Sequence, residues 1–290
     1  MVIADNKTRW NSTFLSLERG LKLYNKISAY SLDNKDELGE DFLLPEDWDI
    51  LRRIESYLQP FHRTTKQLEG HATDGHHGAI WEALPAMEYL LRHLEHLKQT
   101  VPKRDTRIWE CVNNSWAKLN EYYNITDSNH AVYAAATLLH PAMRMTYFRK
   151  NWIGKCASWI PVMEAKCRDV WETEFLPLAL RNTTSSEPED TFLNDMMGLE
   201  VSTNGDEFYK YAHRNPTPVD EPKRFNPINW WNEPKTSFPS LHLYAFDTLA
   251  IPAMSAECER VFCSAKKLIT PERNRLAEEV IKALSLDRFW

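Results

Sequence analysis

Apolar residues recur at every third or fourth position along most of this chain, which is the spacing of one face of an α-helix. Between Phe14 and Ile27 they predict a helix over about residues 12–30, and the polar, acidic stretch 31–44 predicts a loop. Pro45 is followed by two acidic residues and predicts the start of the next helix. Proline fits the first helical turn, and carboxylates favour its positive end.

The same spacing continues to the end of the chain. A break around 70–78 and a polar, acidic linker at 181–190 separate the periodic stretches. No stretch alternates apolar and polar residues for long enough to predict a strand. The sequence therefore predicts a mainly α-helical protein, with further helical stretches at 48–61, 80–97, 108–122, 131–139, 145–152, 159–175 and from 241 to 286.

Composition narrows the class of protein. Only eight of the 290 residues are glycine, which disfavours a β-rich fold with tight turns and glycine-rich phosphate loops. The formal net charge is -6, so contact with nucleic acid requires a local basic patch. The five cysteines include no CxxC pair, which predicts neither a disulfide framework nor a zinc finger. No apolar run approaches the ~20 residues of a membrane span, and we expect no membrane association.

One histidine-rich loop invites a metal-site interpretation. It contains His71, His76 and His77 around Asp74, together with glycine. The histidines form no i,i+4 pair of the kind that places two ligands on one helix face. We therefore expect no metal site there.

Four blocks stand in order along nearly the whole chain. Together they resemble the motifs of the hAT transposase superfamily, and the last block is the most specific. The blocks are 8–13 (TRWNST), 138–152 (LLHP, then YF and W), 230–241 (WW, then FPSL) and 249–262 (LAIPAMSAECERVF).

This resemblance implies a C-terminal remnant of an RNase H-like core that is interrupted by a helical insertion-type domain. In the family, three carboxylates bind two divalent metal ions, Mg²⁺ or Mn²⁺. The third carboxylate matches Glu259, whereas the first two lie upstream of the TRWNST block, where Asp5 is too close to replace either. One carboxylate does not hold two metal ions, so we expect neither a cofactor nor catalysis from this chain alone. A fragment of an active DNA transposase remains an alternative.

The last two blocks resemble the family's C-terminal dimerisation region. The resemblance implies a homodimer or a dimer with a related hAT protein. The expected domains are an RW-motif segment of the truncated core at 1–30, a helical insertion-like domain at 31–204 and the dimerisation region at 205–290. The apolar residues that we expect at the dimer interface are Trp230, Trp231, Leu249, Ile251, Met254, Val261, Phe262, Leu276, Val280, Ile281 and Leu284.

Two sets of residues suggest DNA binding. Arg9 and Trp10 match the family's RW pair, which contacts DNA. A second set forms a basic patch suited to phosphates, although nearby glutamates leave a solvated helix face equally open. A nuclear, DNA-binding adaptor is therefore a further alternative. The residues of the basic patch are Lys266, Lys267, Arg273 and Arg275.

Overall fold

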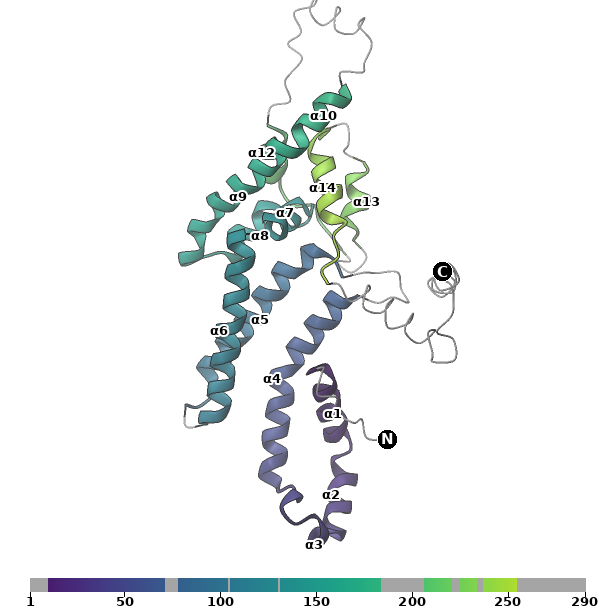
Figure 1. The fold of residues 1–290 in the computed structure, drawn as a ribbon, viewed down its shortest axis with the longest axis vertical. Coiled ribbons are helices and arrows are strands. Elements are labelled where there is room, and N and C mark those ends of the chain that lie inside the picture. The colour runs from purple at the N-terminus through teal and green to yellow at the C-terminus, as the bar shows by residue number, and fades with distance from the viewer. Residues whose placement is uncertain are drawn as a thin grey trace, which may run out of the picture. The chain divides into compact units, whose positions relative to one another are not determined.

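The computed structural model describes residues 10–70, 78–103, 105–129, 131–183, 206–220, 225–233 and 237–254 (Figure 1). The chain divides into two compact units, unit 1 (Met1–Gln67) and unit 2 (Leu68–Trp290). Within the described ranges the elements are helical, and the one extended pairing is an isolated antiparallel bridge between Ala79 and Pro252. The prediction of a mainly α-helical protein is confirmed.

Two of the predictions for unit 1 are wrong in detail. The helix predicted over 12–30 is two helices separated at Leu23, three residues after the weak helix former Gly20. The predicted loop at 31–44 is helical as far as Asp41, because carboxylates in the first turns favour short helices. The elements are α1 (Trp10–Lys22), α2 (Tyr24–Asp33), α3 (Lys35–Leu38), the 3-10 turn η1 (Gly39–Asp41) and α4 (Pro45–Glu69).

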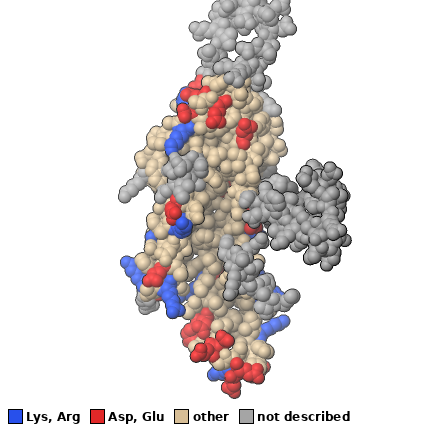
Figure 2. Space-filling view, in the orientation of Figure 1, with Lys and Arg blue, Asp and Glu red and all other residues tan. Residues whose placement is uncertain are grey.

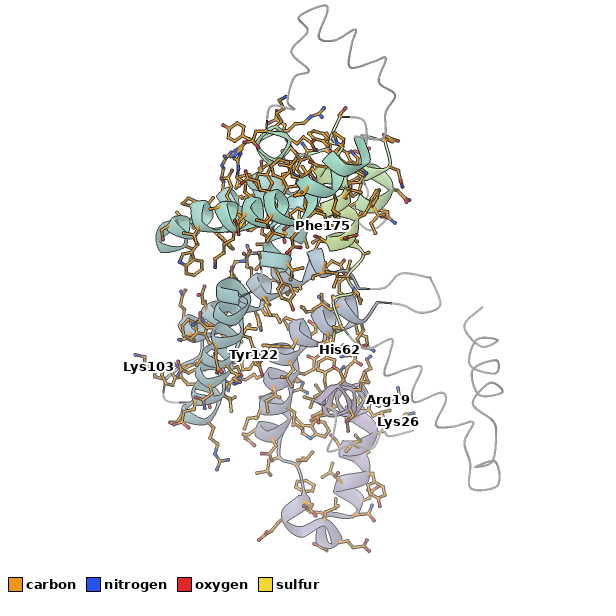
Figure 3. The ribbon with its side chains drawn as sticks, turned by 45° about the horizontal axis from the view of Figure 1, so that its top comes forward. Arg19, Lys26, His62, Lys103, Tyr122 and Phe175 are labelled. Atoms are coloured by element: carbon orange, nitrogen blue, oxygen red, sulfur yellow. The ribbon has the colours of Figure 1, made fainter. Side chains whose placement is uncertain are left out.

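The core of unit 1 is small. Phe14 and Trp48 are its buried side chains among the residues described. Phe14 stacks on His62 of α4 at 4.5 Å, and Tyr24 of α2 meets Trp48 edge-on at 4.9 Å. These two aromatic contacts attach α1 and α2 to α4. Figure 3 shows His62 on α4, with Arg19 and Lys26 on α1 and α2.

Unit 2 contains a helix at each described position where the sequence predicts one. Helix α10 also enters the predicted linker 181–190, most of which lies outside the described residues. The elements are η3 (Ile80–Glu82), α5 (Ala83–Thr100), α6 (Thr106–Asn129), α7 (Ala131–Leu139), α8 (Arg144–Asn151), η4 (Gly154–Ser158), α9 (Trp159–Val170), the short π-helix η5 (Trp171–Phe175), α10 (Leu176–Thr183), α12 (Glu207–Ala212), α13 (Pro227–Trp231) and α14 (Leu241–Leu249).

Helix α7 lies at the centre of unit 2. Its residues from Ala135 to Leu139 are all buried, and it contacts α8, α9 and α14 (Figure 1). Alanine side chains allow the neighbouring helices to approach closely, so α7 packs on several of them at once. Phe175 of the short π-helix η5 stacks on Tyr244 of α14, with 4.7 Å between the ring centroids, and extends this core (Figure 3). No helix in the described part of the chain is long and apolar enough to cross a bilayer.

Candidate functional site

The carbonyl oxygen of Leu139 joins two sequence-distant blocks. The last carbonyls of a helix have no partner within it, and Leu139 ends α7. Its oxygen accepts hydrogen bonds from the Tyr211 hydroxyl at 2.6 Å and from Trp231 Nε1 at 2.9 Å. Trp231 is fully buried in this position. The WW block is therefore anchored on the LLHP block.

Arg144 makes a second connection between the same blocks. It begins α8 with a positive φ of 52°, and its side chain is buried. One guanidinium nitrogen donates to the Asn215 carbonyl at 3.0 Å, and the group lies over the rings of Tyr211 at 4.5 Å and Trp230 at 5.4 Å. Burial lowers the pKa of Arg144, yet a guanidinium remains charged at neutral pH. Cation–π contacts therefore hold the WW block on α8.

Glu88 of α5 is a buried carboxylate with three donors. It accepts from Trp152 Nε1 at 2.6 Å, from the Tyr147 hydroxyl at 2.6 Å and from the Tyr123 hydroxyl at 3.1 Å. Burial raises the pKa of Tyr147, so this phenol stays protonated and donates. The sequence interpretation missed Glu88, although a signal was present, because Glu88 follows Leu84 by four residues on the apolar face of α5.

Glu207 of α12 binds the start of α14. Its Oε2 accepts from the Ser240 amide at 3.1 Å, the Ser240 hydroxyl at 2.9 Å and the Leu241 amide at 3.0 Å. Trp171 Nε1 donates to the same hydroxyl at 3.0 Å. The carboxylate satisfies amides that a helix N-terminus leaves without partners and lies at its positive end. These hydrogen bonds connect α12 to the start of α14, and the Trp171 indole connects the start of α14 to η5.

The start of the LAIPAM block divides into a buried and an exposed part. Leu249 is 2% exposed, whereas Ile251 and Met254 are 38% and 39% exposed. The backbone between them is held in place, because the Ile80 amide donates to the Ile251 carbonyl at 3.2 Å and the Ala253 amide donates to the Gly78 carbonyl at 2.8 Å. Two apolar side chains are therefore presented to solvent on a fixed backbone.

The structure places only some of the predicted site residues. Trp231 and Leu249 are buried within their own chain and Trp230 is half-buried, so their contact with a second copy stays a prediction. Trp10 is the first residue of α1. The others lie outside the described residues. They are Arg9, Glu259, Val261, Phe262, Lys266, Lys267, Arg273, Arg275, Leu276, Val280, Ile281 and Leu284, together with the loop residues His71, Asp74, His76 and His77.

His140 follows the Leu139 anchor and is uncharged at neutral pH. Burial lowers its pKa to about 4, and its Nδ1 accepts from the Ala142 amide at 3.3 Å. The described ranges bring no three His, Cys, Asp or Glu side chains together in a way that could hold a metal ion. What this region shows is a polar and aromatic junction between the blocks.

A model of the hAT family C-terminal dimerisation region matches residues 207–290. The match begins at Glu207, the carboxylate that caps α14. It includes both the buried Trp231 and the exposed Ile251 and Met254.

Three proteins are similar to nearly the whole chain. The putative transcriptional regulator tpeD of Talaromyces stipitatus is 27% identical over 302 aligned positions, which cover 98% of this chain and 31% of that protein. The zinc finger BED domain-containing protein DAYSLEEPER of Arabidopsis thaliana is 21% identical, covering 99% and 40%. The putative AC transposase of Zea mays is 24% identical, covering 99% and 36%. The chain thus spans 31% to 40% of the length of these relatives. It carries a hAT family C-terminal dimerisation region and is a distant homologue of the hAT transposases over nearly its whole length.

Proposed function

We propose that this chain is a transposase-derived protein whose C-terminal region binds a second copy of the chain or a related hAT protein. The match of residues 207–290 to the dimerisation region supports this proposal. In the described part of that match, Tyr209, Ile251 and Met254 are exposed large apolar side chains, and Ile251 and Met254 lie where the backbone is held in place. Exposed apolar side chains that continue into an apolar segment are typical of protein interfaces.

Burial decides which substitutions test the proposal. Leu249 and Trp231 belong to the core of unit 2, so a charge at either position would disrupt the fold before it could report on an interface. Ile251 and Met254 have room for a charged side chain in the monomer. Ile281 adds a test within the predicted interface further along the chain.

The experiment is light scattering of the full chain over a range of concentrations. We expect the parent to be a dimer. The double variant Ile251→Asp/Met254→Asp and the single variant Ile281→Asp should be folded monomers by circular dichroism. The matched control Tyr89→Asp/Tyr122→Asp changes two exposed side chains of α5 and α6 and should remain dimeric. A folded parent that is monomeric at every concentration would reject the proposal.

We further propose that the 290-residue polypeptide does not cleave DNA by itself. The resemblance implies three carboxylates around two metal ions, and in this sequence only Glu259 has a matching position. Incubation with supercoiled plasmid and Mg²⁺ or Mn²⁺ should leave the plasmid intact. Nicking that disappears in Glu259→Gln would contradict this and establish an active transposase fragment.

For the cell we propose a nuclear location. The support is that two relatives are named as a putative transcriptional regulator and a putative AC transposase. A fluorescent fusion of the whole protein tests this location. Exclusion of the fusion from nuclei in interphase cells would contradict it.

A further inference from the structure

One end of unit 1 presents apolar side chains to solvent. Five large apolar residues between positions 30 and 50 are 36% to 66% exposed. They belong to one end of unit 1, because α2 and α4 are in contact through Tyr24 and Trp48, and α3 and η1 connect the end of α2 to the start of α4 (Figure 1). We call residues 30–50 the acidic end. Its exposed apolar residues are Tyr30, Leu32, Leu43, Leu44 and Ile50.

Unit 1 has little core of its own. Helices α2 and α3 and the turn η1 contain no buried residue, and Phe14 and Trp48 are the buried side chains in its described part. Domains of about 60 residues are marginally stable even with a full core. Burial of the acidic end against another surface would therefore add apolar contact that unit 1 lacks.

The charge of the acidic end selects the kind of partner. Eight carboxylates lie between positions 33 and 49 with one basic residue, Lys35. Of these carboxylates, Asp49 pairs with Arg52 at 2.6 Å and Asp47 accepts from the Leu44 amide at 2.8 Å. Figure 2 shows acidic side chains gathered over this end of unit 1. The exposed carboxylates that remain are Asp33, Asp36, Glu37, Glu40, Asp41 and Glu46.

This charge disfavours two obvious occupants. Nucleic acid is a polyanion and would be repelled by the carboxylates. A symmetric contact between the acidic ends of two copies would bring like charges together. A cationic surface with an apolar stripe would be attracted by the carboxylates of the acidic end and would bury its exposed apolar side chains.

We propose that the acidic end of unit 1 binds a cationic amphipathic helix of a protein partner. The apolar stripe of that helix packs on Leu32, Leu44 and Ile50, and its lysines and arginines face the carboxylates. Amphipathic helices bind exposed apolar surfaces in this way, with spacing i, i+3, i+4. This interaction is separate from dimerisation, because it uses unit 1 and not residues 207–290.

The test uses the full chain and a fluorescent peptide of about 18 residues, or five helical turns, built from leucine and lysine at that spacing. We expect micromolar binding that weakens as salt rises from about 50 to about 300 mM, since screening reduces surface attraction. Leu32→Ser/Leu44→Ser and Glu37→Gln/Glu40→Gln/Asp41→Asn should each weaken binding about tenfold or more. On binding, amide exchange in α1, α2 and α4 should slow.

Matched controls distinguish this interaction from nonspecific binding of the peptide to the protein surface. Tyr89→Ser/Val162→Ser and Glu95→Gln/Glu110→Gln alter exposed residues of unit 2 and should leave the affinity unchanged. Ile251→Asp/Met254→Asp should also leave it unchanged, whether or not it abolishes a dimer. Three results would overturn the proposal. They are equal binding of a scrambled peptide of the same composition, full affinity in the acidic-end variants, or loss of self-association in Leu32→Ser/Leu44→Ser, which would identify a second copy as the occupant.

Discussion

The two units bury their aromatic side chains in different ways. The described part of unit 1 has two buried aromatic side chains, Phe14 and Trp48, and each contacts a ring of another helix. In unit 2, buried indole and phenol groups also donate hydrogen bonds to acceptors far away in sequence. Trp152 reaches Glu88 across 64 residues, and Trp231 reaches Leu139 across 92.

This difference explains where stability resides. A buried tryptophan or tyrosine contributes apolar area and also a polar group that needs a partner. In unit 2 those partners are a helix-end carbonyl and a buried carboxylate, so each aromatic side chain fixes a distant segment. The described part of unit 1 has two buried side chains, whereas unit 2 has a large buried core, so we expect unit 1 to open at a lower free energy than unit 2.

The largest expected effect is that of Trp231→Ala. The substitution leaves a large cavity and removes one donor from the Leu139 carbonyl. We expect a loss of about 4 kcal/mol in the free energy of unfolding, measured by urea denaturation followed by circular dichroism. The half-buried neighbour is the control, since Trp230→Ala should cost clearly less. Equal losses at the two positions would show that the buried hydrogen bond and cavity do not distinguish them.

Glu88→Leu tests the carboxylate of unit 2. The change leaves the donors of Trp152, Tyr147 and Tyr123 buried without their acceptor. We expect a loss of about 3 kcal/mol by urea denaturation, because unsatisfied buried polar groups are costly. Glu88→Gln keeps one acceptor oxygen and should lose less.

The control for this substitution is on the same helix. Glu95 is exposed on α5, and Glu95→Gln should change the free energy of unfolding by less than about 0.5 kcal/mol. If Glu88→Leu left the free energy of unfolding unchanged, packing of the leucine side chain would compensate for the lost hydrogen bonds of Glu88. The contrast between the units would then rest on buried area alone.

His140 gives the stability of unit 2 a dependence on pH. Its pKa is about 4 when folded and near its ordinary value of 6.5 when unfolded. Between these values the unfolded chain binds more protons, so the contribution is complete above pH 6.5 and is lost as the pH falls towards 4. The expected loss is on the order of 2 kcal/mol.

Urea denaturation at pH 7.0, 5.5 and 4.5 measures this dependence. Carboxylates also titrate in this range, so the parent is compared with His140→Gln, which cannot gain a proton. We expect a shallower decline in the variant. Parallel curves for the two proteins would show that His140 is accessible enough to titrate normally.

The helices could be predicted from the sequence wherever one face is apolar. Helices α4 and α5 carry such faces, and their positions agree with the pattern, whereas α7 is apolar on all sides and is indicated by its short, alanine-rich run. The segment 31–41 carries no apolar period, and its helical turns depend on local carboxylates and turn geometry. A periodicity argument cannot detect helices of this kind.

The junction between the blocks was only partly predictable. The resemblance located Trp152, Trp230 and Trp231 in sequence, but it gave no partners for them. Glu88 meets Tyr123, Tyr147 and Trp152 across separations of 35, 59 and 64 residues, which only the tertiary fold brings together. An apolar pattern also identifies a face to be covered without specifying which chain covers it, and the structure buries Leu249 in its own chain.

The smallest expected effect is that of Leu32→Ser, matched with Leu138→Ser. Both replace the same residue type in a helix, but Leu32 is 66% exposed and Leu138 is 1% exposed. Leu138→Ser removes buried apolar contacts and adds a buried hydroxyl, so it should cost more than about 2 kcal/mol. Leu32→Ser should change the free energy of unfolding by less than about 0.5 kcal/mol. Urea denaturation measures the cost of Leu138→Ser, and amide exchange of unit 1 measures that of Leu32→Ser.

A cost above about 1 kcal/mol for Leu32→Ser in a monomeric sample would mean that the chain itself covers the acidic end. The contrast between the units and the proposed docking surface would then both fail.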